Sequence, residues 1–212
     1  MRDVEVHLVT LAAEPERFAL LESLLSPDER ARAARLVFAE HRHHFTVCRG
    51  TLREILGRST GVEPRALAFV QNEYGKPALP EGRLRFNVSH SAGLALIAVS
   101  AHRELGVDIE RMNRRVAEER IAERFFSPNE AAKLRALPVE EQTHAFFRCW
   151  TRKEAYIKAR GMGLALPLHS FDVTLGPDEP AAILRGGEGW EIESLDPAEG
   201  FAGALVASTF GR

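Results

Sequence analysis

Two acidic residues stand two positions apart in the segment Gly106-Val107-Asp108-Ile109-Glu110. The apolar residues between and before them favour a strand, and on a strand residues i and i+2 face the same side, so Asp108 and Glu110 project together. Two carboxylates on one face repel each other unless a cation or a proton lies between them, and hard oxygen ligands suit Mg²⁺. The pair is therefore either part of a metal site or the ordinary acidic face of an edge strand.

A third carboxylate lies in the segment that runs from Trp150 to Lys158, WTRKEAYIK. On a helix Trp150, Glu154 and Lys158 share one face because they are four residues apart. Glu154 could supply another oxygen to a metal ion, and Lys158 could reach a phosphate group one turn away. The alternative is a surface Glu–Lys pair, which stabilises a helix by about 0.2–0.5 kcal/mol.

Two further motifs carry polar residues. Gly75-Lys76-Pro77 predicts a turn in which the glycine lets a ligand approach the backbone. Ser89 and His90 could be a nucleophile and its base, but neighbouring strand residues point to opposite faces, so we expect both to donate to a phosphate instead. The sequence contains neither GxxxxGK[ST] nor GxGxxG, which excludes the common phosphate-binding loops.

The elements that must position these residues repeat along the chain. Ser-Pro-Asp-Glu at 26–29 and Ser-Pro-Asn-Glu at 127–130 each predict a helix start with a capping box, 101 residues apart. The same offset places Arg53 against Glu154. We interpret the chain as two similar halves, 1–101 and 102–212; chance similarity in an Ala- and Arg-rich chain is the alternative.

The predicted elements favour the α+β class with antiparallel sheets, because in each half the helices precede most of the strands. Helices are predicted at 27–38, 42–57, 116–124, 128–137 and 140–160. Strands are predicted at 4–11, 67–71, 84–88, 94–100, 105–110, 170–175, 190–195 and 203–209.

Composition sets further bounds. The chain has 212 residues, of which 45% are hydrophobic, and this composition is typical of a globular protein. Its net charge of −2 argues against nucleic-acid binding through bulk charge. Two cysteines cannot form a disulfide framework. Because there is neither a signal-peptide pattern nor an apolar run of membrane-spanning length, we expect a cytoplasmic protein that does not engage a membrane.

In their order along the chain, these motifs resemble one family. The segments GKP, FNVSHS, GVDIE, FFSPNE and WTRKEAYIKARGMGLALPLHSF resemble the Sfp-type 4′-phosphopantetheinyl transferases, in the branch with a W-x-x-KEA signature. The resemblance runs from about Ser26 to Val173. It implies two similar α/β halves related by a pseudo-twofold axis, with the active site between them.

The resemblance also implies a reaction. Enzymes of this family move the phosphopantetheine arm of coenzyme A, their substrate, to a serine of an apo acyl, peptidyl or aryl carrier protein, with Mg²⁺ as the cofactor. Adenosine 3′,5′-bisphosphate is released. The partners expected for this chain are therefore coenzyme A and a carrier protein, and we expect a monomer.

Residue roles follow from the matching motifs. The first half is expected to contact the nucleotide and phosphates, and the second half to hold the metal. Asp108, Glu110 and Glu154 match the metal-binding carboxylates; Lys158 matches the lysine that contacts the pyrophosphate; Ser89 and His90 match residues that hold coenzyme A phosphates; Lys76 lies in the nucleotide-binding turn; and Arg32 is the expected partner of the 3′-phosphate.

Several points stay open at this stage. Some relatives carry a second basic residue where this chain has Glu29, and Arg49 or Arg53 could compensate. The general base is hypothesised to be Glu154, acting directly or through a metal-bound water, with Glu130 as a second candidate whose capping-box role competes. The alternative functions are another Mg²⁺-dependent phosphoryl transfer or nucleotide hydrolysis, and a coenzyme A-binding or carrier-docking module without turnover.

Overall fold

The computed structural model describes residues 1–80, 82, 84–118 and 121–209. The first part of the chain forms β1 (Glu5–Thr10), α1 (Pro15–Leu24), α2 (Pro27–Ala34), α3 (Ala39–Thr60), the 3₁₀ turn η1 (Pro64–Ala66), β2 (Val70–Gln71), β3 (Pro77–Ala78), β4 (Arg85–Ser91) and β5 (Leu94–Ser100). The second part forms β6 (Leu105–Arg111), α4 (Arg114–Glu118), α5 (Ile121–Phe125), α6 (Pro128–Ala136), α7 (Val139–Arg160), the turns η2 (Gly163–Ala165) and η3 (Leu168–Ser170), β7 (Asp172–Val173), β8 (Ile183–Arg185), β9 (Trp190–Leu195) and β10 (Phe201–Ser208).

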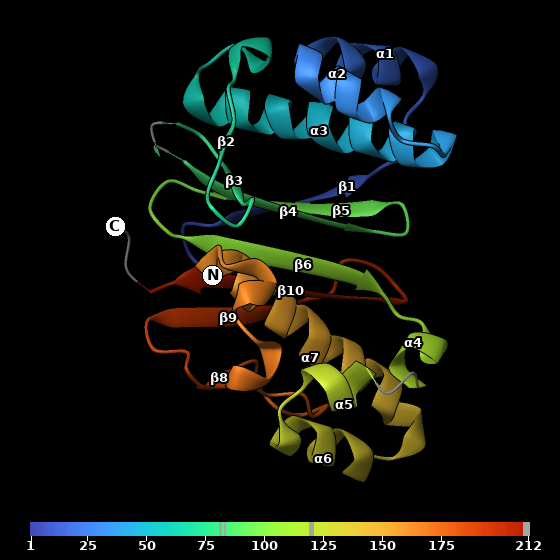
Figure 1. Ribbon diagram of the computed structural model, residues 1–212, viewed down its shortest axis with the longest axis vertical. Coiled ribbons are helices and arrows are strands. Elements are labelled where there is room, and N and C mark those ends of the chain that lie inside the picture. Colours follow the sequence, from blue (N-terminus) through green and yellow to red (C-terminus); the bar gives the residue numbers. More distant parts are fainter. Residues whose placement is uncertain (81, 83, 119–120, 210–212) are drawn as a thin grey trace.

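Two three-stranded antiparallel sheets have the same internal order. The first is β1-β5-β4 and the second is β6-β10-β9, so each sheet takes its strands from one of the two predicted halves. Figure 1 shows helices α1–α3 on one side, the two sheets in the middle and α4–α7 on the other side. The predicted α+β class with antiparallel sheets is confirmed, whereas the boundary at residue 101 stays a prediction.

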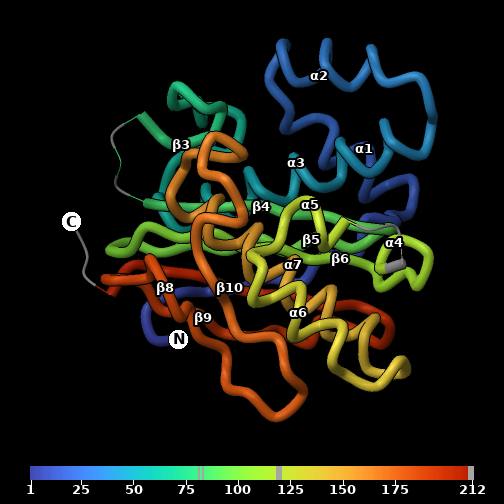
Figure 2. The backbone as a smooth tube through the Cα atoms, turned by 60° about the horizontal axis from the view of Figure 1, so that its bottom comes forward, coloured from blue at the N-terminus to red at the C-terminus, as the bar shows by residue number. Residues whose placement is uncertain are grey.

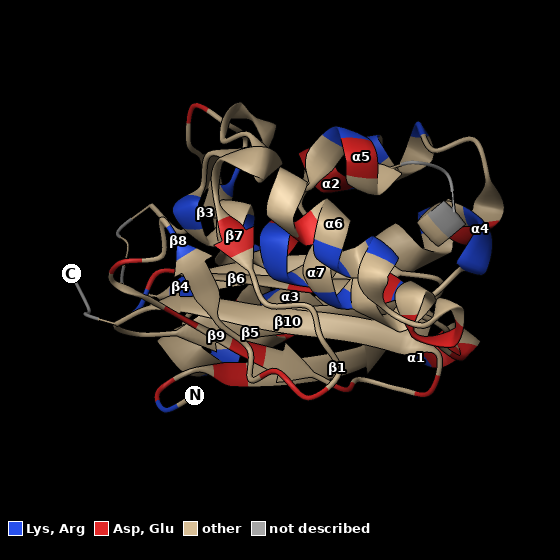
Figure 3. Cartoon of the chain, turned by 90° about the horizontal axis from the view of Figure 1, so that it is seen from below, with Lys and Arg blue, Asp and Glu red and all other residues tan. Residues whose placement is uncertain are grey.

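The core follows from the two-residue period of the strands. Ile97 and Val99 of β5 pack with Leu52, Ile55 and Leu56 of α3, whereas the alternate residues Leu96 and Ala98 pack with the second sheet. In β10, Ala204 and Val206 pack under α7, and the alternate residues Leu205 and Ala207 join the core between the sheets. β10 carries no charged side chain, and it is uniformly tan in Figure 3.

Both predicted capping boxes form, at Ser26–Glu29 and Ser127–Glu130. The helix predicted at 42–57 begins at Ala39 and ends at Thr60. The helix predicted at 116–124 is represented by α4 and α5, and residues 119 and 120 of that prediction lie outside the described residues. Helix α1 was not predicted, because its N-cap Glu14 makes no side-chain capping bond and only Leu21 and Leu24 of the helix are buried.

The repeat extends to a buried ion pair in each half. Glu29 binds Arg53 at 2.7 Å, and Glu130 binds Lys153 at 2.7 Å. Arg53 and Lys153 occupy the same position in two 22-residue helices, and each also donates to two backbone carbonyls, those of Pro64 and Leu67 and those of Leu168 and Phe171. In the structure, Arg53 therefore corresponds to Lys153 of the other half. The 101-residue offset predicts instead that Arg53 corresponds to Glu154. The prediction is wrong here because the long helices are related by an offset of 100.

Among the described residues, no helix combines the length and the apolar character needed to cross a bilayer.

Candidate active site

Strands β4 and β6 lie side by side where the two sheets meet, and side chains of β4 bridge to β6. The Ser89 hydroxyl donates to Oδ1 of Asp108 at 2.7 Å, and the Ser91 hydroxyl donates to Oε2 of Glu110 at 2.8 Å. The Asn87 amide oxygen accepts a backbone N–H of β6 at 2.9 Å. Alternate residues of the FNVSHS segment therefore orient both carboxylates that sequence analysis singled out.

Strand β6 faces the core with one side and α7 with the other. Val107 and Ile109 enter the core between the sheets, so Asp108 and Glu110 face the helix, as the alternation predicts. The helix comes close because residue 106 has no side chain: a Cβ at Gly106 would lie 2.2 Å from the Ala155 carbonyl oxygen. This contact sets the spacing between the carboxylates of β6 and the polar face of α7.

Asp108 is the centre of the polar cluster. Its side chain is buried, and Oδ1 accepts hydrogen bonds from Ser89 and from Nζ of Lys158, the latter at 2.6 Å. Lys158 also donates to the Ser89 hydroxyl at 2.9 Å. The other oxygen of Asp108, Oδ2, is buried without a hydrogen-bond partner. A buried carboxylate oxygen without a partner is costly unless a further donor or a cation reaches it.

Glu110 and Glu154 complete the cluster. Burial raises the pKa of the Glu110 carboxyl; the hydrogen bond from Ser91 opposes that rise, and the charge of Asp108 adds to it. Burial also raises the pKa of Glu154, the negative charge of Asp108 raises it further, and Lys158 opposes both effects. The three carboxylates therefore act on one another, and the structure brings together Asp108, Glu110, Glu154, Lys158 and Ser89.

The donor chemistry of this cluster fits a hard divalent cation, since all three side chains present carboxylate oxygens and Oδ2 of Asp108 has no other partner. Within the described residues, however, no three His, Cys, Asp or Glu side chains are already gathered around a common point. The Lys158 ammonium lies on Asp108 and offsets part of the negative charge.

A second polar site lies in the first half. A pocket of about 580 Å³ is lined by three arginines, Arg32, Arg49 and Arg53, and by the rings of Phe45 and Phe69. Gln71 and Pro77, from the two-stranded β2–β3 ribbon, also line it. Arg32 lies over the Phe45 ring at 5.2 Å, and Arg49 lies over the Phe69 ring at 5.1 Å. Arginines held against aromatic faces present planar donors suited to phosphate.

Glu29 contacts two of these arginines, Arg53 closely and Arg49 at a longer distance. Arg53 is buried, and its guanidinium is bound by Glu29 and by two carbonyl oxygens. Arg49 lies 3.5 Å from Glu29, and burial lowers its pKa while Glu29 opposes that effect. Of the two arginines expected to compensate for Glu29, Arg53 therefore serves the fold, and Arg49 remains beside Arg32.

His90 lies on the face of β4 opposite to Ser89, as the strand alternation predicts. Burial lowers the pKa of its imidazole, and the positive charges of Lys158 and His44 lower it further. The charges that act on the ring therefore come from Lys158 of α7 and from the histidines of α3, and they favour its neutral form.

Lys76 and Glu130 lie elsewhere. The Lys76 ammonium donates to the carbonyl oxygens of Leu105 and Ala159, so the structure does not bring it into the Arg32 pocket. Both oxygens of Glu130 are engaged: Oε2 accepts from Ser127 N–H and Lys153, and Oε1 accepts from the backbone N–H of Val173. Glu130 is a structural residue of α6 and is removed from the carboxylate cluster.

Sequence analysis missed Asn87 and Ser91. The signal was present, because Asn87, Ser89 and Ser91 are polar residues at alternate positions of a predicted strand, and that spacing places all three on one face.

Comparison with known proteins covers nearly the whole chain. A family model described as the 4′-phosphopantetheinyl transferase superfamily matches residues 104–206, and one described as 4′-phosphopantetheinyl transferase, N-terminal, matches residues 11–102. The chain is 43% identical to the 4′-phosphopantetheinyl transferase HetI of Nostoc sp., over 98% of this chain and 89% of the relative. It is 36% identical to the 4′-phosphopantetheinyl transferase Sfp of Bacillus subtilis, over 80% of this chain and 74% of the relative.

Among solved structures, a holo-(acyl-carrier-protein) synthase from Bacillus anthracis in complex with CoA (3′,5′-ADP) aligns with a TM-score of 0.44 and 23% sequence identity. The alignment covers 50% of this chain and 94% of that chain.

Proposed function

The chain belongs to the 4′-phosphopantetheinyl transferase superfamily, and we propose how its own residues carry out the reaction of that family. It is an enzyme that transfers the 4′-phosphopantetheine group of coenzyme A to a serine of an apo carrier protein and releases adenosine 3′,5′-bisphosphate. The observation that carries the assignment of residues is the cluster of Asp108, Lys158 and Ser89 beside Glu110 and Glu154, at the seam between the two sheets.

The metal-binding role falls to Asp108, Glu110 and Glu154. Support comes from their carboxylate oxygens, their mutual repulsion and the unpartnered Oδ2 of Asp108. A Mg²⁺ ion held there would supply Lewis-acid charge to the pyrophosphate of coenzyme A. Ser89 and Ser91 orient two of the three carboxylates, so they act on the substrate through Asp108 and Glu110.

Lys158 offsets negative charge during transfer. Its ammonium has three donors, and Asp108 and Ser89 hold two of them, which leaves one for a phosphate oxygen. As the carrier serine attacks the β-phosphate, charge accumulates on the phosphate oxygens and on the departing nucleotide, and a preorganised cation stabilises that charge.

The serine proton needs an acceptor. Glu154 lies one helical turn before Lys158, and in the described part of the chain its carboxylate accepts no side-chain or backbone hydrogen bond. Glu130 is occupied by Lys153, Ser127 and Val173. We therefore assign proton acceptance to Glu154.

The nucleotide end of coenzyme A is assigned to the pocket of Arg32, Arg49, Phe45 and Phe69. Arg32 and Arg49 supply the positive charge for the 3′-phosphate, and Arg49 takes the role that a basic residue at position 29 would have. His90, one strand residue beyond Ser89, is influenced by the charges of Lys158 and of the α3 histidines and is proposed to meet a phosphate of the same substrate.

A cytoplasmic location and a monomeric state are also proposed. In support of a reducing compartment, both cysteines are buried free thiols, and burial raises the pKa of Cys48 to about 11.

The function is tested by incubating the protein with coenzyme A, Mg²⁺ and a panel of apo acyl, peptidyl and aryl carrier proteins, followed by mass spectrometry of each carrier. We expect one carrier or more to gain the mass of one phosphopantetheine group on a serine. Nucleotide release without any carrier would instead identify a hydrolase. Tight coenzyme A binding with no mass gain on any carrier would identify a binding module.

A further inference from the structure

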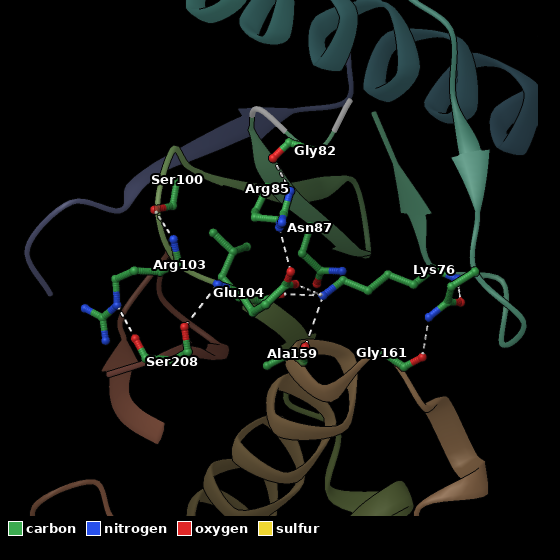
Figure 4. Close-up of polar contacts among 12 residues, drawn as sticks. Lys76, Gly82, Arg85, Asn87, Ser100, Arg103, Glu104, Ala159, Gly161 and Ser208 are labelled. Atoms are coloured by element: carbon green, nitrogen blue, oxygen red, sulfur yellow. Dashed lines mark hydrogen bonds and ion pairs between the residues drawn. The ribbon is translucent and has the colours of Figure 1, made fainter. Parts of the chain in front are cut away.

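The Lys76 ammonium lies among acceptors from three other segments of the protein. It donates to the carbonyl oxygens of Leu105 at 3.0 Å and Ala159 at 3.1 Å, and Oε2 of Glu104 lies 3.6 Å away. Figure 4 shows the side chain extended from its turn toward Ala159 and Glu104. Two of its three donors are therefore bound by main-chain carbonyls, and the Glu104 carboxylate offsets its charge. Glu104 is itself fixed by Nε of Arg85 at 2.5 Å.

Asn72, at the other end of the same turn, makes the matching contact. Its Oδ1 accepts the backbone N–H groups of Tyr74 and Lys76, which builds the turn between β2 and β3. Its Nδ2 donates to the carbonyl oxygen of Gly161 at 2.7 Å. One side chain thus shapes the turn and ties it to the residue that ends α7.

The carbonyls of Ala159 and Gly161 belong to the last turn and the C-cap of α7, where backbone acceptors lack partners within the helix and a cation is favourable. Lys158, which contacts Asp108, directly precedes Ala159. Leu105 begins β6, three residues before Asp108. The turn therefore contacts both elements that carry the active-site cluster. It contacts α7 next to Lys158, and it contacts β6 three residues before Asp108. Figure 2 shows the β2–β3 region beside the segment that follows α7.

The same ribbon also borders the nucleotide pocket. Gln71 and Pro77, the neighbours of Asn72 and Lys76 in the chain, line the pocket of Arg32 and Arg49. Gln71 and Pro77 therefore face the pocket of Arg32 and Arg49, whereas Asn72 and Lys76 contact the elements that carry the carboxylate cluster.

We propose that Asn72 and Lys76 are positioning residues that fix the end of α7 and the start of β6 against the nucleotide pocket, so that the phosphate held by Lys158 and the nucleotide held by Arg32 and Arg49 belong to one extended substrate. The proposal rests on the roles assigned above to Lys158 and Arg32. It assigns Lys76 to the protein frame and not to a phosphate.

Three variants test it. Lys76→Met removes the ammonium and keeps an apolar side chain of similar length. Asn72→Asp keeps the acceptor that builds the turn and removes the Nδ2 donor to Gly161. Lys133→Met is the matched control, because Lys133 is an exposed lysine paired with Glu179 on α6. For each variant, kcat and KM for coenzyme A are measured at saturating carrier, with the Kd of coenzyme A by calorimetry and folding by circular dichroism.

We expect Lys76→Met and Asn72→Asp to lower kcat about tenfold or more while KM and Kd for coenzyme A stay within about threefold, since a small misplacement of a catalytic group costs rate before it costs ground-state binding. Lys133→Met should match the wild type. The preference for coenzyme A over 3′-dephospho-coenzyme A should be unchanged in both turn variants, as no phosphate contact is lost.

Two results would overturn the proposal. A rise of about tenfold in KM and Kd for coenzyme A with kcat intact would assign Lys76 to a phosphate. Unchanged kcat in both turn variants would remove any positioning role. If Lys76→Met does not fold, Asn72→Asp decides alone, because its turn is preserved. Absence of transfer by the wild-type enzyme would instead count against the proposed function, so the two failures are distinguishable.

Discussion

The two halves share a frame and differ on one strand face. Each has a helix-capping glutamate that binds a buried cation on a 22-residue helix, Glu29 with Arg53 and Glu130 with Lys153. Each long helix then continues with a glutamate, Glu54 or Glu154, directly after that cation.

The difference lies in the strand beneath the helix. In β1 the side toward α3 carries Glu5, His7 and Val9, because these residues pair with Val99, Ile97 and Ala95 of β5. Val9, followed by Leu11, packs with apolar residues of α1 and α3. In β6 the side toward α7 carries Gly106, Asp108 and Glu110. The first-half face therefore packs through Val9 and carries an exposed acid, Glu5, whereas the second-half face carries two carboxylates, one of which binds the lysine of α7. The chemistry thus depends on a few residues of β6 and not on the shared arrangement of helix and strand.

The largest expected effect is a loss of folding stability when a buried ion pair is broken. Glu130→Ala leaves the Lys153 charge fully buried, and removing one partner of a buried pair typically costs about 3–5 kcal/mol. Glu29→Ala should cost less, because Glu130 also accepts the Val173 N–H and Glu29 has no corresponding strand contact among the described residues. Urea denaturation of both variants and the wild type measures the difference. Equal losses of stability would contradict this distinction between the halves.

The next effect is on catalysis. Asp108→Ala should lower transfer at least about a hundredfold, because it removes the central carboxylate and the anchor of Lys158, while the variant stays folded, since Lys158 can reach water. Glu5→Ala, which removes an exposed acid from β1, should transfer at the wild-type rate. Carrier mass spectrometry gives the rates, and circular dichroism gives the folded fraction. If the Asp108→Ala variant unfolded, Asp108 would be a residue that stabilises the fold and not one that serves the reaction.

The smallest effect concerns the first-half pocket. Arg49→Met should raise KM for coenzyme A about tenfold with kcat nearly intact, because it removes a charge from the ground-state contact with the nucleotide. Arg58→Met, on the exposed side of the same helix, should leave KM unchanged. Steady-state kinetics at fixed ionic strength compares them. A lowered kcat with unchanged KM would mean that Arg49 supports the fold around Glu29 instead.

Much of the site could be predicted from local spacing. Strand alternation placed Asp108 and Glu110 on one face and Ser89 opposite to His90, and helix spacing placed Glu154 and Lys158 together. These relations depend only on the period of one element, and the capping boxes at Ser26 and Ser127 depend only on neighbouring residues.

What could not be predicted depends on packing between distant elements. The GKP turn is visible in the sequence, but the partners of Lys76 come from β6 and α7. Arg49 and Arg53 are equally plausible ligands in the sequence, and they are separated by the buried contacts of Arg53 with Glu29 and with two main-chain carbonyls. The offset of 101 residues held for the capping boxes and failed in the long helices, because α3 begins 12 residues after the start of α2 whereas α7 begins 11 residues after the start of α6.

The absence of a side chain at Gly106 restricts which residues can replace it. Even a methyl group there would meet the Ala155 carbonyl at 2.2 Å and the Ala159 amide at 2.3 Å, both of them main-chain atoms of a helix that cannot yield locally. Every substitution at this position must therefore push α7 as a whole away from β6, and with it the lysine from its aspartate. The close contact of β6 with α7 therefore requires glycine at this position.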